Sequence, residues 1–208
     1  RSLESEEAQL WSVEPKVDGL ALALHYREGE LWVAATRGDG RTGDEVTSNA
    51  RRFLNLPSRL REPLSFELRG EVYMDHERFD ALNTRREKQG EEPFANPRNL
   101  AAGTLKLLDG REVARRGLSF VAHSVVEQDL ASSHHAELER LEALGLPTLP
   151  HRKLCRGRDE VVEWIESLDA HREDLPFEID GAVVKLDSLD SRRRMGSTSK
   201  SPRWGIAF

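Results

Sequence analysis

The sequence contains a single cysteine, Cys155, among 208 residues. One cysteine excludes an internal disulfide and any zinc site built from several cysteines of this sequence, and it favours a reducing, cytoplasmic setting. No apolar run approaches the roughly 18 residues that a membrane-spanning helix needs, so we expect no membrane span. The first ten residues are acidic and polar and lack the apolar stretch of a signal peptide.

Positive charge is also in deficit, because 31 Lys and Arg residues stand against 37 Asp and Glu residues, for a net charge of −6. A module that grips nucleic acid mainly through its phosphates is usually basic. We therefore expect this chain not to hold DNA tightly by itself. Its length and its 38% of hydrophobic residues suit one large domain or two tightly packed lobes.

Strand-like and helical segments alternate along the chain, mostly as hairpins and not as regular βαβ units, which predicts an α+β fold. No period of roughly 20–50 residues repeats, so solenoids and propellers are excluded. The predicted strands cover 13–18, 20–26, 31–37, 66–74, 118–126, 179–186 and 204–208. Predicted helices follow a capping box at 42–45, cover 75–90, start at Pro97, and lie near 136–144, 160–168 and 189–195.

The segment Glu14-Pro15-Lys16-Val17-Asp18-Gly19 carries the sharpest chemical signal. On a regular strand Glu14, Lys16 and Asp18 share one face, and Gly19 permits a close turn beneath a ligand. A lysine attacks phosphorus only as a free amine, so such a site must lower its pKa from about 10.4 by desolvation or neighbouring cations. Alone, so short a motif recurs by chance, and an exposed hairpin edge is the simpler interpretation.

Three further segments combine charge with apolar patterning. Glu71 lies on a strand face where it either forms a surface ion pair or receives a ribose hydroxyl. Lys185 ends an apolar run, where a buried amine is costly unless it meets an anion such as phosphate. Asp180 differs from Lys185 in parity, so either Gly181 forms a bulge or the two serve opposite sides. Arg98 lies in a first helical turn, where the dipole disfavours a cation, and a nearby anion would explain it.

In this order and with these spacings, the segments resemble the NAD-dependent DNA ligases of bacteria over nearly the whole chain. The resemblance implies a nucleotidyltransferase (ATP-grasp-like) α+β domain, with antiparallel sheets flanked by helices around a nucleotide cleft. Residues 1–208 would form the adenylation domain fragment of a larger ligase. The matching segments are Thr36-Arg37-Gly38-Asp39-Gly40, Arg69-Gly70-Glu71-Val72, Phe94-Ala95-Asn96-Pro97-Arg98-Asn99, Asp180-Gly181 to Lys185, and Ser201-Pro202-Arg203-Trp204. The segments at 36–40 and 94–99 separate this family from ATP-dependent ligases and capping enzymes.

The resemblance also implies a role for each candidate residue. Lys16 would be the nucleophile that takes AMP from NAD, releasing nicotinamide mononucleotide in the first step of nick sealing. Glu14 would hydrogen-bond adenine, and His123 would stack on it where some members carry tyrosine. The carboxylates expected at the ribose and at Mg²⁺ are Asp18, Glu71 and Asp180. The cations expected at phosphate are Arg37, Arg98, Lys106 and Lys185. Arg172 is expected at nicked DNA.

Several parts of such ligases do not occur in this sequence, including the domain that binds nicotinamide mononucleotide, the OB-fold and the zinc finger with its zinc site. The family's next residue after Phe208 is a catalytic lysine. We therefore expect a monomer that binds NAD or AMP, contacts nicked duplex DNA weakly, and reacts slowly or not at all as an isolated fragment. Two alternatives stay open: an adenine-nucleotide-binding module without turnover, and an ATP-dependent ligase or capping relative.

Two charged clusters are expected to face solvent. The first is not expected to bind a metal, while for the second a DNA backbone contact in the intact enzyme stays open as an alternative. His134 and His135 stand at a helix start within a charged stretch, and residues 192–194 form a run of three arginines on a short helix. The four tryptophans are expected to be packing residues, and Cys155 a small, partly buried one.

Overall fold

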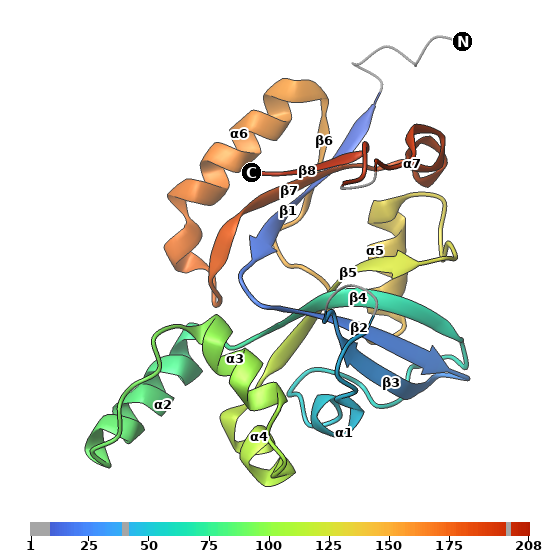
Figure 1. The fold of residues 1–208 in the computed structure, drawn as a ribbon. Coiled ribbons are helices and arrows are strands. Elements are labelled where there is room, and N and C mark those ends of the chain that lie inside the picture. The colour runs from blue at the N-terminus through green and yellow to red at the C-terminus, as the bar shows by residue number, and fades with distance from the viewer. Residues whose placement is uncertain (1–8, 39–41, 199–200) are drawn as a thin grey trace.

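Two four-stranded β-sheets organise the residues that the computed structural model describes, which are 9–38, 42–198 and 201–208 (Figure 1). The first sheet has the order β6-β1-β7-β8, with β1 at Leu10–Val17, β6 at Lys153–Arg156, β7 at Ile179–Leu186 and β8 at Gly205–Ala207. The second has the order β3-β2-β4-β5, with β2 at Leu20–Arg27, β3 at Glu30–Thr36, β4 at Phe66–Tyr73 and β5 at Ser119–Val126. All pairings between these strands are antiparallel, which confirms the predicted α+β class.

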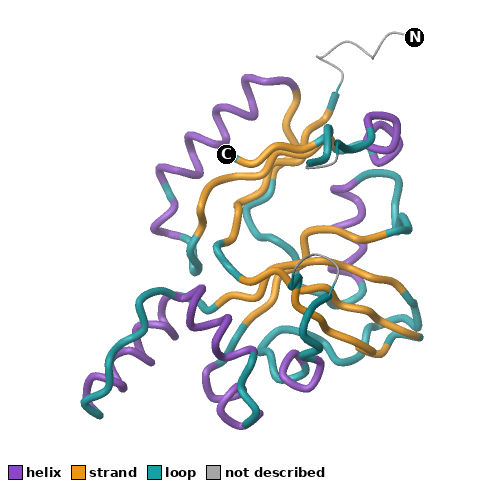
Figure 2. Tube along the Cα trace, viewed as in Figure 1, coloured by secondary structure: helices purple, strands orange, loops and turns teal. Residues whose placement is uncertain are grey.

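Helices flank the two sheets, with α6 beside the first sheet, α1 and α4 beyond the second, and α5 at a level between them (Figure 1, Figure 2). Helix α6 packs on the first sheet through β1, β6 and β7, whereas α3 and α5 pack on the second. None of the helices in the described segments is long and apolar enough to cross a membrane. Their bounds are α1 Thr47–Ala50, α2 His76–Lys88, α3 Pro97–Leu105, α4 Gly110–Arg116, α5 His134–Ala143, α6 Gly157–Ala170, the 3₁₀ helix η2 Arg172–Asp174, and α7 Leu189–Met195.

Side-chain caps fix where two of the predicted helices begin. The Asp75 carboxylate accepts a hydrogen bond from the backbone N–H of Arg78 at the start of α2. Asn96 does the same for Asn99 at the start of α3, where Pro97 occupies the first turn. Such caps satisfy backbone donors that a helix leaves free at its N-terminus, so these two starts were readable from the sequence.

The predicted capping box at 42–45 is wrong. Helix α1 begins after Val46, which makes no side-chain cap, and the helix has only four residues. The preceding chain runs beside β3 instead: the backbone N–H of Thr36 donates to the carbonyl of Asp44, and that of Val46 to the carbonyl of Ala34. Pairing with β3 therefore overrides the local helix signal. Helix α4 and strand β6 were not predicted, and residues 39 and 40 of the predicted 36–40 turn lie outside the described residues.

The apolar core follows the strand alternation read from the sequence. Leu22, Leu24 and Tyr26 are almost fully buried in the largest cluster, beneath the second sheet. A smaller cluster contains Val17 and Val121, one from each sheet, so it joins the two sheets. Under α6 a third cluster encloses Cys155, which is completely buried and not partly exposed as expected; its partners are Val13, Val161 and Val184.

Two glycines give a matched test of this packing. A Cβ at Gly70, on β4, would lie 2.1 Å from the carbonyl oxygen of Val121 and 2.3 Å from the ring of Phe120. We expect Gly70→Ala to lower the free energy of unfolding by about 1–3 kcal/mol. Gly103 lies exposed within α3 and has nothing within 4 Å of its Cβ position. Gly103→Ala should raise stability by about 0.5–1 kcal/mol. Urea unfolding of both variants checks this, and equal effects would contradict it.

Candidate active site

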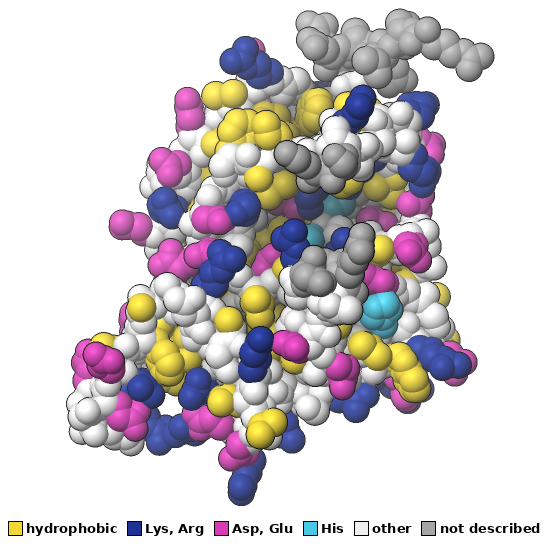
Figure 3. Space-filling model, in the orientation of Figure 1, with side chains coloured by type: hydrophobic (Ala, Val, Ile, Leu, Met, Phe, Trp, Pro, Cys, Tyr) yellow, Lys and Arg dark blue, Asp and Glu magenta, His cyan; other side chains and the backbone are white. Residues whose placement is uncertain are grey.

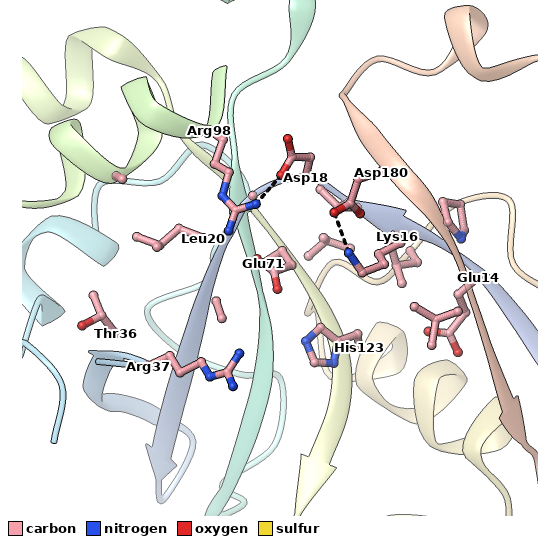
Figure 4. Close-up of a pocket in the computed structure, with 18 of the residues that line it drawn as sticks. Glu14, Lys16, Asp18, Leu20, Thr36, Arg37, Glu71, Arg98, His123 and Asp180 are labelled. Atoms are coloured by element: carbon pink, nitrogen blue, oxygen red, sulfur yellow. Dashed lines mark hydrogen bonds and ion pairs between the residues drawn. The ribbon is translucent and has the colours of Figure 1, made fainter. Parts of the chain in front are cut away.

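A cleft of about 660 Å³ lies between the two sheets and receives side chains from both (Figure 4). In the space-filling view, acidic, basic and histidine side chains gather in the band between the sheets (Figure 3). The cleft brings together residues that lie far apart in the sequence. Of the predicted site residues it is lined by Glu14, Lys16, Asp18, Arg37, Glu71, Arg98, Lys106, His123, Asp180 and Lys185.

Arg172 is the predicted site residue that does not line the cleft. It belongs to the short helix η2, and its guanidinium donates to the backbone carbonyl of Ile179 at 2.7 Å. Ile179 is the first residue of β7. Arg172 therefore touches the strand that carries Asp180 from outside the cleft.

Lys16 projects from β1 into the middle of the cleft, where its Nζ lies 2.6 Å from Oδ2 of Asp180 (Figure 4). About 38% of the Lys16 side chain and 40% of the Asp180 side chain are exposed, so water reaches this ion pair. Its partner on β7 is set by the register: Pro15 pairs with Ala182 and Val17 pairs with Ile179. Two residues of β7 therefore face Lys16 alone.

This bulge resolves the parity question left by the sequence. Gly181 has a φ of +138°, a conformation that glycine adopts without the strain other residues meet. The extra residue reverses the alternation of β7, so Asp180 and Lys185 both line the cleft although their parity differs. Of the two alternatives read from the sequence, the bulge at Gly181 is the one found.

Asp18 supplies the anion that the position of Arg98 called for. Arg98 Nη1 lies 2.8 Å from Asp18 Oδ1, and both side chains are partly exposed. Asp18 follows β1 directly and is followed by Gly19, where a Cβ would lie 2.4 Å from the carbonyl oxygen of Val72 on β4. The glycine is thus required by the approach of a neighbouring strand, and not only by a ligand.

Glu71 faces the cleft from β4 between these two ion pairs (Figure 4). Burial raises the pKa of its carboxyl to about 7, although Arg98 and Lys16 both act to lower it. Near neutral pH this carboxyl therefore exchanges a proton readily. No three His, Cys, Asp or Glu side chains within the described ranges are arranged to hold a metal ion.

The inner end of the cleft is closed by a buried ion pair. Glu14 is 1% exposed; its Oε1 accepts hydrogen bonds from Ser12 Oγ at 2.9 Å and from His134 Nε2 at 2.6 Å. Its Oε2 accepts from Lys185 Nζ at 2.7 Å, and Lys185 also donates to the backbone carbonyl of His123 at 2.9 Å. The expectation that His134 is solvated is wrong, because its side chain is fully buried.

The charges in this network are fixed by mutual contact. Burial alone would raise the pKa of Glu14, but Lys185 and His134 outweigh it and hold that pKa below its ordinary value. Burial and Lys185 lower the pKa of His134 to about 4, and the same causes hold the pKa of His123 below its usual range. At neutral pH both imidazoles are therefore neutral, and His134 donates its Nε2 proton to the ionised Glu14.

Sequence reasoning missed His134 because no local signal marks it: its partner Glu14 lies 120 residues away along the chain. It also missed Arg192, which was expected to be a solvated helix residue and is 7% exposed. The Arg192 guanidinium donates to the carbonyl of Leu186 and lies 4.6 Å above the ring of Trp204. A run of like charges says nothing about which member turns inward.

Apolar side chains complete the lining of the cleft. They include Leu20 of β2, Val121 of β5, Val183 of β7, and Leu149 from the segment between α5 and β6. Together with the neutral His123 ring they give the cleft apolar walls. A flat aromatic ligand fits such a setting, since ligand pockets combine apolar walls with a few placed polar groups.

The two lysine ion pairs should differ in their effect on stability. Lys185→Met leaves Glu14 charged and buried without its cation, and we expect a loss of about 3–5 kcal/mol in the free energy of unfolding. Lys16→Met removes one half of an exposed pair and should change it by less than about 1 kcal/mol. Urea unfolding measures both. Adding Glu14→Gln to Lys185→Met should recover most of the lost unfolding free energy, because it removes the unpaired buried charge. Equal effects of Lys185→Met and Lys16→Met would refute the distinction between a buried and an exposed ion pair.

The lowered pKa of His134 predicts acid lability. As the pH falls below about 6.5, the unfolded chain protonates this histidine while the folded chain does not until about pH 4, so stability is lost across that window. The loss between pH 7 and pH 5 should be on the order of 2 kcal/mol. His134→Gln, which cannot titrate, should show a shallower dependence than wild type or His135→Gln in urea unfolding at the two pH values. Identical slopes would rule out this cause.

Comparison with known proteins agrees with the geometry. The family model for the NAD-dependent DNA ligase adenylation domain matches residues 1–208. The chain is 48% identical over 200 residues to the DNA ligase of Bacillus velezensis, and 46% identical over 200 residues to that of Bacillus subtilis; each match covers 95% of this chain and 30% of the relative. It is 47% identical over 197 residues to the DNA ligase of Oceanobacillus iheyensis, with 94% and 30% covered.

The chain thus spans about 30% of the length of the curated relatives it matches. Among solved structures, mycobacterial DNA ligase D complexed with ATP and MES aligns with 88% of this chain and 50% of its own, at 15% identity and a TM-score of 0.47, a likeness too distant to bear on function. The family model and the ligase relatives agree over nearly the whole sequence. The chain belongs to the family of NAD-dependent DNA ligase adenylation domains.

Proposed function

We propose that Lys16 attacks the AMP phosphorus of NAD to form a covalent lysine–AMP, with release of nicotinamide mononucleotide, as the first step of nick sealing by a longer ligase. The observation that supports this best is the position of the Lys16 amine, which projects into the middle of a cleft lined by ten of the predicted site residues. In this step the Nζ–P bond forms, the bond from phosphorus to the bridging oxygen breaks, and the leaving mononucleotide takes the electron pair.

The attacking amine must first lose a proton, and Asp180 is the base within reach. Its Oδ2 lies 2.6 Å from Lys16 Nζ, within the range required of a general base. Because the side chains of both Lys16 and Asp180 are partly exposed to solvent, this ion pair can separate when a phosphate group approaches. The cations that we assign to the phosphates are Arg37, Arg98 and Lys106, all on the cleft wall.

We assign the nucleoside to the inner half of the cleft. The neutral His123 ring and the apolar walls suit a stacked base, and Glu14 with Lys185 lies at the end of that space. Glu71 is assigned to the ribose. The Glu14 carboxylate is not a free group at this base site, because it already accepts hydrogen bonds from three protein donors.

Mg²⁺ fits these residues as an ion that arrives with the phosphates and not as one held in a preformed site. Mg²⁺ is usually bound through one or two carboxylates, with substrate phosphates and water completing its shell. Asp18 and Asp180 each already face a cation, and Glu71 is in part protonated near neutral pH. When bound, the ion would screen phosphate charge. Asp18, Glu71 and Asp180 remain the carboxylates able to reach it.

For the whole ligase we propose that residues 1–208 act as a single cytoplasmic adenylation domain, monomeric in this form. Arg172, which lies outside the cleft lining and has a half-exposed side chain, is assigned to nicked DNA. The net charge of −6 supports weak DNA binding by this chain alone. A passive adenine-nucleotide module and an ATP-dependent donor are the functions to be tested against this one.

Intact-mass spectrometry tests the proposal with NAD or ATP as donor. We expect wild type to gain the mass of one AMP with NAD and none with ATP; long incubation with excess NAD lets even a slow reaction accumulate one adduct per chain. Lys16→Arg keeps a cation beside Asp180 but removes the nucleophile, so it should fold normally and gain nothing. AMP binding without an adduct would favour the passive module, an adduct from ATP a different donor, and an adduct in Lys16→Arg a different nucleophile.

A further inference from the structure

We propose that His134 is a positioning residue for base specificity: by fixing the Glu14 carboxylate, it makes the inner end of the cleft accept a 6-aminopurine in preference to a 6-oxopurine. This inference rests on the proposed function, because it concerns the base that the cleft takes. It deepens that function by naming a residue, outside the recognised motifs, that decides which base fits.

Hydrogen-bond capacity leaves one acceptor and one donor open at this end of the cleft. An ionised carboxylate has about four acceptor positions. Ser12 and His134 occupy both on Oε1 of Glu14, and Lys185 occupies one on Oε2. An ammonium has three donors, and Lys185 uses two, on Glu14 and on the carbonyl of His123. Glu14 thus keeps one acceptor position and Lys185 one proton.

The order of these two groups discriminates between purines. Adenine presents an amino donor beside a ring-nitrogen acceptor, so its amino group pairs with Glu14 and its ring nitrogen with Lys185. A 6-oxopurine presents an acceptor beside a ring N–H donor, which is the reverse order. It would fit only if Glu14 and Lys185 exchanged places. Discrimination therefore depends on what prevents the carboxylate from turning.

His134 is the group that can prevent it. Ser12 lies on the same strand as Glu14, so its bond moves with β1. His134 comes from the start of α5, where its backbone N–H donates to the carbonyl of Asp187 at 2.9 Å and the Ser133 side chain caps the helix. Its ring is completely buried and anchors Glu14 from outside the sheet.

The chemistry of the ring suits this role. His134 is neutral at neutral pH, so it offers Glu14 a proton without a second positive charge to displace Lys185. Lys185 Nζ and His134 Nε2 lie 3.4 Å apart, but both nitrogens carry protons, so this contact is not a third hydrogen bond of the lysine. Nδ1 has no hydrogen-bond partner within the described residues, and the nearest acidic group, Glu137, lies 4.0 Å away. The ring's hydrogen bond to another side chain is the one to Glu14.

Calorimetric titration of AMP and of inosine monophosphate tests the proposal, with the ratio of the two dissociation constants as the readout. His134→Leu, which keeps bulk but removes the donor, should reduce the preference for AMP about tenfold or more. His134→Gln, whose amide can reach Glu14, should keep the preference within about threefold of wild type. His135→Leu is the matched control: His135 is the next residue of α5, contacts Glu139, and should leave the ratio unchanged.

A purely structural role would lower the affinity for both nucleotides by one factor and leave the ratio unchanged, which would overturn the proposal. Loss of preference in His134→Gln equal to that in His134→Leu would also overturn it, because the donor would then be irrelevant. If His134→Leu does not fold, His134→Asn replaces it, since its shorter side chain withdraws the donor from Glu14. Failure of the proposed function appears in a different measurement, as wild type that gains no AMP adduct from NAD, whereas wild type that binds AMP and inosine monophosphate equally would refute this inference alone.

Discussion

The buried ion pair of Glu14 and Lys185 is the constraint on which the rest of the site depends. It joins β1 to β7 within the first sheet and, through the bond from Lys185 to the carbonyl of His123, joins both to β5 of the second sheet. Burying two charges stabilises a fold only when the remaining donors and acceptors are also satisfied. His134 and Ser12 satisfy Oε1 of Glu14, so the polar link between the sheets holds before any ligand enters, with one acceptor position of Glu14 and one proton of Lys185 still open.

The ion pairs in the outer part of the cleft are exposed to solvent, in contrast to the buried pair at the inner end. Lys16–Asp180 and Asp18–Arg98 are ion pairs whose members are each about one-third to one-half exposed, where such contacts contribute little stability. These charges can change partners when a phosphate arrives. We therefore assign different roles to the two ends of the cleft. The fixed inner end holds the nucleoside in place, and the exchangeable outer charges rearrange around the reacting phosphate.

Local features of the fold were predictable from the sequence, and long-range ones were not. The alternation of Leu22 and Leu24 and the caps at Asp75 and Asn96 depend on neighbours within a few residues, and they were read correctly. The 42–45 capping box failed because that segment pairs with β3. Helix α4 and strand β6 are short and carry little periodicity.

The same limit applies to the site. Motif residues could be expected to converge, because a shared chemistry implied it, and the cleft does bring ten of them together. His134 could not be placed, since its burial is decided by contacts 120 residues distant, and Arg192 turns inward only because Trp204 and a strand carbonyl receive it. The bulge at Gly181, finally, makes the spacing between Asp180 and Lys185 a fixed length. Losing or gaining a single residue in this stretch would invert the alternation of β7, turn Lys185 to the opposite face and leave Glu14 buried without its counter-charge.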